Sequence, residues 1–529
     1  MFARPPESVR ELLEAQVERS PDKEFLFVES DWRVLTYREF DEEVNRAARL
    51  LGSLKVAKGD RVSLLLTNRP EYLIFYFACF KIGAWAGPVN AMLKPREIEF
   101  VVSDSEAGTL VTQSDLYPGV AEACARLASL RDVIVIEEGG QWGVVGGGPM
   151  ARSDPPRVES VRQATEQNLS SAAHVLPAAA ISRDDEAVII YTSGTTGNPK
   201  GVLLTHGNLL ANARQIAEWL GLGEEDRSLM IMPLFHVNAL MTTGLAALWA
   251  GASIVLAPRF SASRHWETIA RYGVTYFGSV ATMLSLLNQT YPDGMPQGLD
   301  ASRLRFALCG SAPVPVEVMR RFESLFRCPV IEGYGLSEST CRSTFNPTDG
   351  RRRIGSVGLA IGNEVRIFDE NDRELGPRQI GEIVLRGPNI MKGYYRNPSA
   401  TQEAFRSGWF HTGDLGYRDE DSFFYVVDRK SDMIIRGGEN VYPREIDEVL
   451  YNHPKIKDAA TIGVHDPLYG EEVKSFVVLR EGCEATEAEI IEFCRARLAD
   501  FKCPKKIEFL DDIPKGPTGK LLKRELSKS

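Results

Sequence analysis

Residues 191–201 read YTSGTTGNPKG, a run of glycines and small hydroxyls that ends in Pro-Lys-Gly. The run follows a β-branched stretch at 187–191 and precedes a helical pattern at 207–220. Glycines let backbone N–H groups turn toward one point, while hydroxyls and a lysine add donors and charge, as a polyphosphate requires. It is no Walker A loop, because the lysine stands three residues after the second glycine. A plain surface turn is the alternative, but the density of these residues favours phosphate binding by Thr192, Ser193, Gly194, Thr195, Thr196, Gly197 and Lys200.

Strand and helix patterns alternate on both sides of this loop. Short β-branched runs at 187–191, 274–277 and 304–308 are followed by amphipathic stretches at 207–220, 281–289 and 315–326. Such alternation is typical of crossover units around a mainly parallel sheet. The sequence therefore predicts parallel-sheet α/β subdomains for most of the first 330 residues.

The pattern changes twice toward the C-terminus. From about residue 354 to 427, short strands separated by turns predict a small antiparallel, barrel-like module. Beyond residue 430 the pattern is α+β, with helices at 444–452 and 487–498 and strands at 459–464, 473–479 and 506–510. A stretch of this length can form its own core. We therefore expect a large domain over residues 1–429 and a small, mobile one over 430–529.

The composition limits the partners of the 529-residue chain. Its 62 basic and 72 acidic side chains give a formal net charge of −10, and basic residues gather only in short patches such as 351–353, so we expect no nucleic-acid partner. The eight cysteines form no CxxC pair and no disulfide framework, and the N-terminal residues contain no apolar leader. These features are typical of a reduced, cytoplasmic protein.

Residues 229–258 contain no Asp, Glu, Lys or Arg, a run long enough to span a bilayer. Pro233, His236, Asn238 and Gly251 interrupt it, however. A strand, a loop, a helix and a second strand at 253–257 inside an α/β core fit the pattern better, so we expect no transmembrane segment.

Seven further motifs occur in order after the loop: PLFH (233–236), GSAP (310–313), YGLSES (334–339), WFHTGD (409–414), VDRK (427–430), GGENVYP (437–443) and PKGPTGK (514–520). The ordered set resembles the signatures of the AMP-forming acyl-adenylate enzymes, which include acyl-CoA synthetases, firefly luciferase and the adenylation domains of peptide synthetases. The resemblance covers essentially the whole chain. It is closest to acyl-CoA synthetases for fatty, aryl or carnitine-type acids.

The resemblance implies a two-step ligase. ATP and a small-molecule carboxylic acid first form an acyl-adenylate and pyrophosphate, and a thiol, usually that of coenzyme A, then displaces AMP. ATP, Mg²⁺ and coenzyme A are thus implied as cofactors and co-substrates. Because the first step brings two anions together, the site must supply positive charge and exclude water.

The resemblance also assigns roles to single residues. Lys520 would bridge the carboxylate and the α-phosphate, and Glu338 would hold Mg²⁺. Ser337, where the family more often has threonine, keeps the hydroxyl for a phosphate contact. Adenine and ribose would be bound by Gly310, Ser311, Ala312, Glu332, Gly333, Tyr334, Asp414 and Arg429. Taken alone, Lys520 could be a tail lysine and Arg429 part of a surface ion pair.

The acyl pocket would be lined by His236, Val237, Ser279, Gly310, Gly335 and Leu336, with His236 as a wall rather than a base. Acetate-type members carry tryptophan where Gly335 stands, so glycine predicts room for a longer acyl group. The expected walls contain no Arg or Lys, which disfavours a dicarboxylate. We expect a medium- or long-chain fatty acid, with an aryl or carnitine-type acid as the alternative.

In this family the small domain rotates between the two steps. Its terminal lysine serves adenylation, and its Gly-rich turn, here Arg436, Gly437 and Gly438, then faces the thiol of coenzyme A. The hinge position is Ser431, where the family has Asp or Lys.

Other functions stay open at this point. An adenylating enzyme that loads a carrier-protein thiol, a non-catalytic nucleotide-binding homologue and an ADP-forming phosphotransferase are the alternatives, and a homodimer is also open. The joint presence of Lys520, Glu338 and Asp414 counts against the non-catalytic reading.

Overall fold

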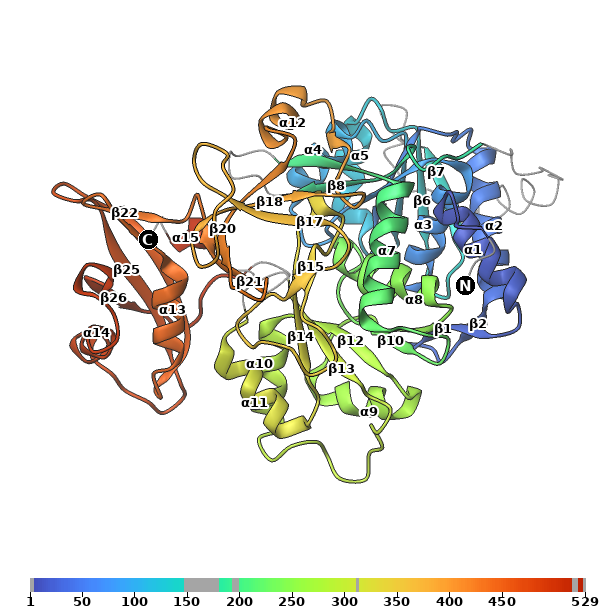
Figure 1. Ribbon diagram of the computed structural model, residues 1–529. Helices are drawn as coiled ribbons and strands as arrows, with labels where there is room; N and C mark the ends of the chain where they lie inside the picture. Colours follow the sequence, from blue (N-terminus) through green and yellow to red (C-terminus); the bar gives the residue numbers. More distant parts are fainter. Residues whose placement is uncertain (1–3, 147–179, 193–198, 311–313, 516–521, 527–529) are drawn as a thin grey trace.

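The computed structural model describes residues 4–146, 180–192, 199–310, 314–515 and 522–526. These residues form a large lobe and a smaller C-terminal lobe, which lies at the left of Figure 1. The α/β class predicted from the sequence is confirmed.

A nine-stranded sheet lies in the large lobe. Its strands in spatial order are β16 (Leu359–Ala360), β15 (Thr344–Phe345), β14 (Val330–Tyr334), β13 (Phe306–Cys309), β12 (Tyr276–Ser279), β10 (Arg227–Met230), β11 (Ser253–Leu256), β1 (Glu24–Val28) and β2 (Val34–Thr36). The six strands from β14 to β1 are parallel, and antiparallel strands close both edges. The connecting helices are α9 (Ala262–Tyr272), α10 (Ala281–Thr290) and α11 (Val316–Phe326). The carboxyl ends of β10, β12, β13 and β14 therefore meet at one edge of the sheet.

A second, eight-stranded sheet has the order β19 (Gly393–Tyr394), β9 (Lys200–Thr205), β8 (Glu186–Thr192), β4 (Trp85–Pro88), β3 (Arg61–Leu65), β5 (Thr109–Gln113), β6 (Asp132–Ile136) and β7 (Trp142–Gly146). Strands β8 to β6 are parallel, whereas β9 pairs with β8 in antiparallel register, Thr192 opposite Lys200. The Gly/Thr loop thus joins two strands of a hairpin, and strand β9, which the sequence analysis did not predict, separates the loop from the helix expected at 207–220. Helix α7 (His206–Leu220) begins only after β9.

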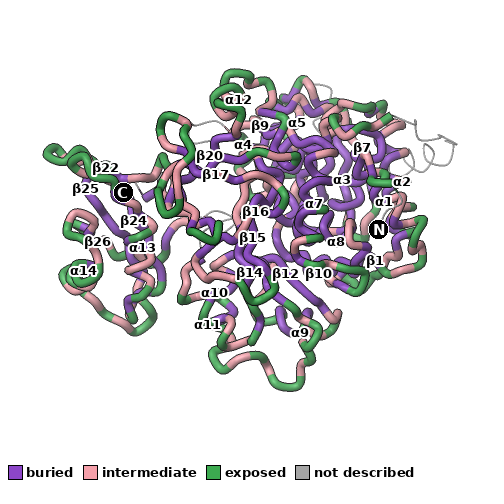
Figure 2. The backbone as a smooth tube through the Cα atoms, in the orientation of Figure 1, coloured by how far each residue is buried: buried purple, intermediate pink, exposed green. Residues whose placement is uncertain are grey.

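Buried helices pack between and around the two sheets: α1 (Val9–Arg19), α2 (Tyr37–Ser53), α3 (Pro70–Ile82), α4 (Pro95–Asp104), α5 (Tyr117–Arg126), α7 and α8 (Ala246–Ala250). Every residue of α3 is buried. At the start of α7, the Thr205 hydroxyl accepts from the Asn208 N–H at 3.1 Å and the Asn208 side chain accepts from the Thr205 N–H at 2.9 Å. One apolar cluster spans both sheets, and buried residues fill the centre of the large lobe in Figure 2.

The charge-free segment folds inside this core as the sequence predicts. It comprises β10, a loop, a π-helix η2 (Ala239–Leu245), α8 and β11. No helix among the described residues is long and apolar enough to cross a membrane.

A four-stranded antiparallel sheet follows, with the order β17 (Glu364–Phe368), β18 (Gly381–Arg386), β20 (Phe410–Arg418) and β21 (Phe424–Arg429), and with α12 (Pro398–Ala404) beside it. It is the small antiparallel module that the pattern predicts.

The C-terminal lobe contains β22 (Ile434–Arg436), β23 (Glu439–Val441), β24 (Ile456–Asp466), β25 (Gly470–Leu479) and β26 (Lys506–Phe509), together with α13 (Pro443–Tyr451), α14 (Glu487–Arg495) and α15 (Lys523–Leu526). Its apolar cluster, which includes Ile434, Ile446 and Ile490, is separate from that of the large lobe. Thr486 caps α14 by accepting from the Glu489 N–H at 3.2 Å, while the Glu489 carboxylate binds Lys455 instead of completing a capping box.

A glycine fixes the approach of the antiparallel sheet to the parallel one. Gly358 has φ +88°, and the Phe424 N–H donates to its carbonyl at 2.9 Å. A Cβ at Gly358 would lie 2.0 Å from the carbonyl carbon of Phe345 and 2.1 Å from the nitrogen of Asn346. Gly350 has a similar φ of +85° with open space around it.

Gly358→Ala is therefore expected to lower the free energy of unfolding by about 3 kcal/mol, because left-handed strain and backbone overlap add. Gly350→Ala, which meets only the strain, should cost about 1 kcal/mol. Urea unfolding followed by tryptophan fluorescence measures both. Equal losses would show that the close approach at Gly358 has no energetic consequence.

Candidate active site

Asp414 lies at the centre of a hydrogen-bonded group between the two kinds of sheet. It is 4% exposed and stands on β20. The Tyr334 hydroxyl, from the end of β14, donates to its carboxylate at 2.7 Å, and the Arg429 guanidinium, on β21, lies 3.1 Å from the other oxygen. The negative charge of Asp414 raises the pKa of Arg429, and burial raises the pKa of Tyr334 well above its usual value. Three of the eight residues predicted to bind adenine and ribose are therefore in contact.

Glu338 lies on the short 3₁₀ turn η3 (Ser337–Ser339), which also carries Ser337. The Tyr394 hydroxyl donates to its carboxylate at 3.1 Å. Burial raises the pKa of Glu338, while Arg429 lowers it and Asp414 raises it, so the charges of the nucleotide site reach Glu338.

A magnesium ion fits this carboxylate, since a cation would offset the cost of its burial. Among the described residues no group of three or more His, Cys, Asp and Glu side chains is placed to hold a metal. Mg²⁺ would accordingly share Glu338 with phosphate oxygens, a coordination that this ion commonly adopts.

The two ends of the Gly/Thr loop face this group. Thr192 ends β8 and Lys200 begins β9, while residues 193–197, all predicted phosphate ligands, fall outside the described residues. The Lys200 ammonium lies 5.1 Å from the centre of the Tyr394 ring. Tyr394 thereby connects the loop to Glu338. The sequence analysis did not single out Tyr394, because no motif marks it.

Glu332 is a buried acid in the middle of β14. It is 3% exposed, and its Oε2 has no hydrogen-bond partner among the described residues. Burial raises its pKa to about 7, while Arg444 and the N–H of Val314 act in the opposite direction. Gly333 follows it, and a Cβ there would lie 2.4 Å from the Phe345 ring. Ser311 and Ala312 lie outside the described residues.

The predicted acyl-pocket residues lie at the carboxyl ends of the parallel strands. His236 and Val237 follow β10, Ser279 ends β12 and Gly310 follows β13. Burial lowers the pKa of His236 to about 4, so the ring is neutral at pH 7, as expected of a wall. The Ser279 hydroxyl donates to the Leu308 carbonyl at 2.8 Å, so its proton is already used in a hydrogen bond within the protein.

The structure gives a different reason for glycine at position 335 from the one expected from the sequence. A Cβ at Gly335 would lie 2.0 Å from the Cys341 carbonyl oxygen and 2.9 Å from the Cα of Arg342. The side of Gly335 toward which a side chain would project is therefore filled by neighbouring backbone. Leu336, the next residue, is half-buried.

Arg342, which is not one of the expected acyl-pocket walls, brings a cation next to one of them. Arg342 is fully buried, and a Cβ at Gly310 would lie 2.5 Å from its Nη1. Its side chain donates to the Gly333 carbonyl and to Asn238, each at 3.4 Å. The sequence analysis missed Arg342 because it lies outside the motifs, in a loop that folds back onto Gly310.

The C-terminal lobe presents α13, not the Gly-rich turn, to the nucleotide site. Arg444, on α13, lowers the pKa of Glu332, and its backbone N–H donates to Asp428 at 3.0 Å. Gly437 and Gly438 form the β22–β23 turn with φ of +59° and +90°. Arg436 bonds Glu472 at 2.6 Å within the same lobe. In Figure 1 β22 lies at the outer edge of that lobe, so the predicted coenzyme A residues are not beside the other candidates.

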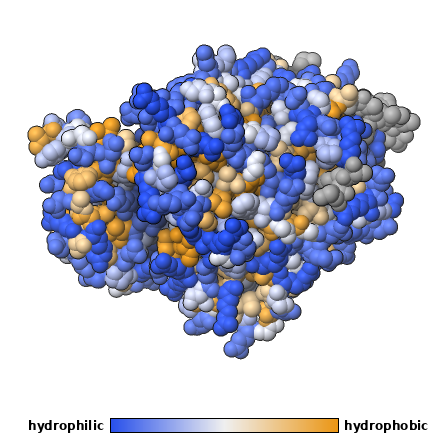
Figure 3. Space-filling view, viewed as in Figure 1, coloured by the Kyte–Doolittle hydropathy of each residue, from blue (hydrophilic) through white to orange (hydrophobic). Residues whose placement is uncertain are grey.

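Ser431 is exposed in the turn between β21 and β22, where its hydroxyl donates to Asp432 at 3.0 Å. Lys520 lies outside the described residues. Figure 3 shows apolar side chains at the outer edge of the C-terminal lobe. Exposed apolar residues of that lobe include Ile435, Leu468 and Tyr469.

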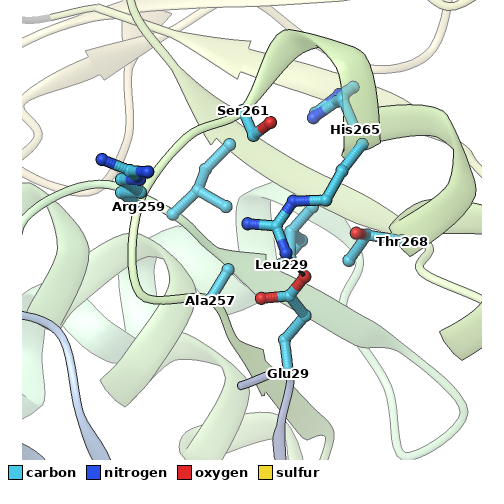
Figure 4. A pocket seen from close by; sticks show the side chains of 9 residues that line it. Glu29, Leu229, Ala257, Arg259, Ser261, His265 and Thr268 are labelled. Carbon is cyan, nitrogen blue, oxygen red and sulfur yellow. Dashed lines mark hydrogen bonds and ion pairs between the residues drawn. The ribbon is translucent and has the colours of Figure 1, made fainter.

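A small cavity beside β11 does not belong to this site (Figure 4). Its volume is about 10 Å³, enough for one water at most. Glu29 and Arg264, which form an ion pair of 3.0 Å, line it together with the buried His265. It has no room for a nucleotide or an acid.

The raised pKa of Glu332 predicts how the stability of the folded protein depends on pH. The folded protein keeps the proton up to about pH 7, whereas the unfolded chain releases it near 4.5, so this stabilisation is complete below pH 4.5 and is lost as the pH rises through 7. Glu332→Gln stays neutral, so its stability relative to the wild type should rise by on the order of 3 kcal/mol between pH 4.5 and pH 8.

Urea midpoints of both proteins at several pH values measure this difference. Asp447, whose pKa burial also raises to about 7, titrates in both proteins and cancels. A difference that does not change with pH would contradict the assignment.

Comparison with known proteins shows which family of proteins the chain resembles. The family model described as AMP-binding enzyme matches residues 13–395, and the model for the AMP-binding enzyme C-terminal domain matches residues 445–520. A sulfoacetate–CoA ligase of Cupriavidus necator is 36% identical, with 97% of this chain and 96% of that protein covered. A long-chain-fatty-acid–CoA ligase of Bacillus subtilis is 34% identical, with coverage of 99% and 94%.

A solved structure, ATP-bound MatB from Rhodopseudomonas palustris, superposes with a TM-score of 0.87 at 29% identity, covering 98% of each chain. The family models match well over half of the chain, and the relatives cover nearly all of it. The chain therefore belongs to the AMP-binding enzyme family.

Proposed function

We propose that the protein is an ATP-dependent carboxylic acid:CoA ligase that forms AMP and pyrophosphate through an acyl-adenylate. The observation that carries the proposal is the buried contact of Asp414 with Tyr334 and Arg429, next to Glu338 at the carboxyl ends of the parallel strands. As an enzyme of this family it is an acid–thiol ligase that uses ATP, Mg²⁺ and coenzyme A.

The residues divide the work of adenylation. The Asp414 carboxylate would accept hydrogen bonds from the ribose hydroxyls, with Tyr334 and Arg429 holding it in place. Thr192, Lys200 and Ser337 would bind phosphate oxygens, and Lys520 would neutralise the approaching carboxylate. Glu338 would hold Mg²⁺, which would supply charge stabilisation for the phosphates. His236 is neutral and has no proton to remove in the first step, because a carboxylate already carries the attacking lone pair.

The second step requires a change in the orientation of the C-terminal lobe. The turn at Gly437 lies at the outer edge of that lobe in Figure 1, and α13 lies against β21. We place the boundary of the two domains near residue 430, with Ser431 as the hinge. Rotation there would exchange Lys520 for the Gly-rich turn. The names of the relatives favour coenzyme A over a carrier-protein thiol as the acceptor.

The acyl group stays a separate prediction. The relatives are named for acids as different as sulfoacetate and long-chain fatty acids. The preference for a medium- or long-chain fatty acid depended on Gly335 and on walls without a cation. Gly335 packs against backbone instead, and Arg342 adjoins Gly310, so fatty, aryl and carnitine-type acids keep only the support of apolar walls such as Val237.

Lys520→Ala is expected to reduce acid-dependent pyrophosphate release by about 10²–10³-fold, because one positioned charge is lost from the transition state. Reaction of a supplied acyl-adenylate with coenzyme A should be unchanged. The control is Lys506→Ala, which removes an exposed lysine from β26 of the same lobe. Equal losses in both half-reactions would contradict a role confined to adenylation.

Asp414→Asn should raise the KM for ATP at least about tenfold, since two charge-assisted bonds to ribose are weakened. Tyr334→Phe keeps the ring and the carboxylate, and should change this KM less than about threefold. Initial rates at saturating acid give both values. A larger effect of Tyr334→Phe would mean that Asp414 positions Tyr334 and does not bind ribose.

A further inference from the structure

Arg342 is a buried cation without an acidic partner. It lies in the connection between β14 and β15, and its whole side chain is buried. None of the acidic side chains in the described residues lies within 4.0 Å of its guanidinium. Its two hydrogen bonds, to Gly333 and Asn238, are both 3.4 Å long, and Nε has no partner there. These bonds are at the weak end of the usual range.

The backbone around Arg342 holds it firmly. The Asn212 side chain accepts from the Arg342 N–H at 3.0 Å and donates to its carbonyl at 2.7 Å, and Asn389 donates to the same carbonyl at 3.3 Å. The guanidinium lies against Gly310, where no side chain keeps it away, and 5.2 Å from the centre of the Phe345 ring. The cation is therefore fixed in place rather than free to reach solvent.

Glu332 does not neutralise it. Among the groups that lower the pKa of Glu332, Arg342 has the smallest effect, and the Glu332 carboxyl interacts with the Val314 N–H and with Arg444. Burying a guanidinium without an anion is costly, so such groups are normally paired. An oxyanion that binds from outside would supply the missing charge and the missing hydrogen bonds.

The position of the guanidinium indicates which ligand brings that anion. Gly310 and Asn238 follow β13 and β10 at the edge where His236 and Val237 lie, and Gly333 precedes Tyr334 of the nucleotide site. This is the candidate acyl pocket. The predicted phosphate ligands Thr192, Lys200 and Ser337 are not among the hydrogen-bond partners of this guanidinium in the described residues, which are Gly333 and Asn238. The anion is then a second group on the acid itself.

We propose that the substrate is a compact acid with a second oxyanion, a carboxylate or a sulfonate, which Arg342 binds while the first carboxylate reacts. This inference rests on the proposed ligase activity and narrows it. Arg342 is thus a residue that determines specificity by touching the part of the substrate that does not react.

Matched acids of equal shape test the proposal. Succinate is compared with 4-methylpentanoate, malonate with 3-methylbutanoate and sulfoacetate with 3,3-dimethylbutanoate, so that each alkyl group replaces one oxyanion; decanoate represents the fatty acids. AMP formation with Mg-ATP and coenzyme A gives kcat/KM for each. For the wild type we expect at least one dianion to exceed its alkyl match by about 10²-fold or more, since a site built for polar groups rejects the apolar analogue.

Arg342→Met should lower kcat/KM for that dianion by about 10²-fold and leave its alkyl match unchanged or improved, with KM for ATP unaltered. Arg342→Lys should be intermediate, because it keeps the charge but loses the planar fork. Gly310→Ala, which places a Cβ against the guanidinium, should lower the ratio of kcat/KM for that dianion to kcat/KM for its alkyl match. It replaces Arg342→Met as the test variant if Arg342→Met does not fold. The carboxylate and sulfonate pairs separate the two oxyanions.

The outcomes of the two proposals can be told apart. A wild-type enzyme that prefers decanoate or the alkyl acids would overturn the role of Arg342 and leave the ligase activity established. A parallel loss on both members of a pair in Arg342→Met would mean a purely structural arginine. Absence of AMP with every acid would overturn the proposed ligase activity, and this inference with it.

Discussion

The carboxylate of Asp414 joins the parallel sheet to the antiparallel one. It accepts from Tyr334 at the end of β14 and pairs with Arg429 on β21, the last strand before the C-terminal lobe. These contacts bring the candidate nucleotide-binding residues, the Glu338 carboxylate and the base of the C-terminal lobe together. At Gly358 the backbone comes close to Phe345 and Asn346, so the same two sheets also approach closely there. Open α/β sheets bind ligands outside the carboxyl ends of their strands, and this edge meets that condition.

Much of this architecture could be predicted from the sequence, because local patterns encode it. The β-branched runs and amphipathic stretches identified β8, β13, α7, α10 and α11, and the change of period marked the antiparallel sheet. The hairpin of β8 and β9 was missed, since six residues from Lys200 resemble the start of a helix as much as a short strand. Only the pairing of Thr192 with Lys200 across the loop reveals it.

Site residues that belong to a sequence motif could be predicted. Residues whose place in the site depends on tertiary contacts could not. Tyr334, Asp414 and Arg429 came together as expected. Gly335 misled, because a glycine in sequence says nothing about which atoms approach it, and here these are the backbone atoms of Cys341 and Arg342. Arg342 and Tyr394 carry no motif at all. Their importance follows from burial and from neighbours that are distant in sequence, Gly310 and Glu338.

Positive charge is a common feature of the candidate site, because the proposed reaction brings an acid to a polyphosphate. Lys200 and Arg429 are candidate nucleotide-binding residues, and the buried Arg342 adjoins Gly310 of the candidate acyl pocket. The product analysis of a reaction with Mg-ATP, coenzyme A and a panel of acids tests this account. It predicts AMP and pyrophosphate in equal amounts, formed only with an acid and accompanied by acyl-CoA. Formation of ADP, or AMP release that does not depend on the acid, would contradict it.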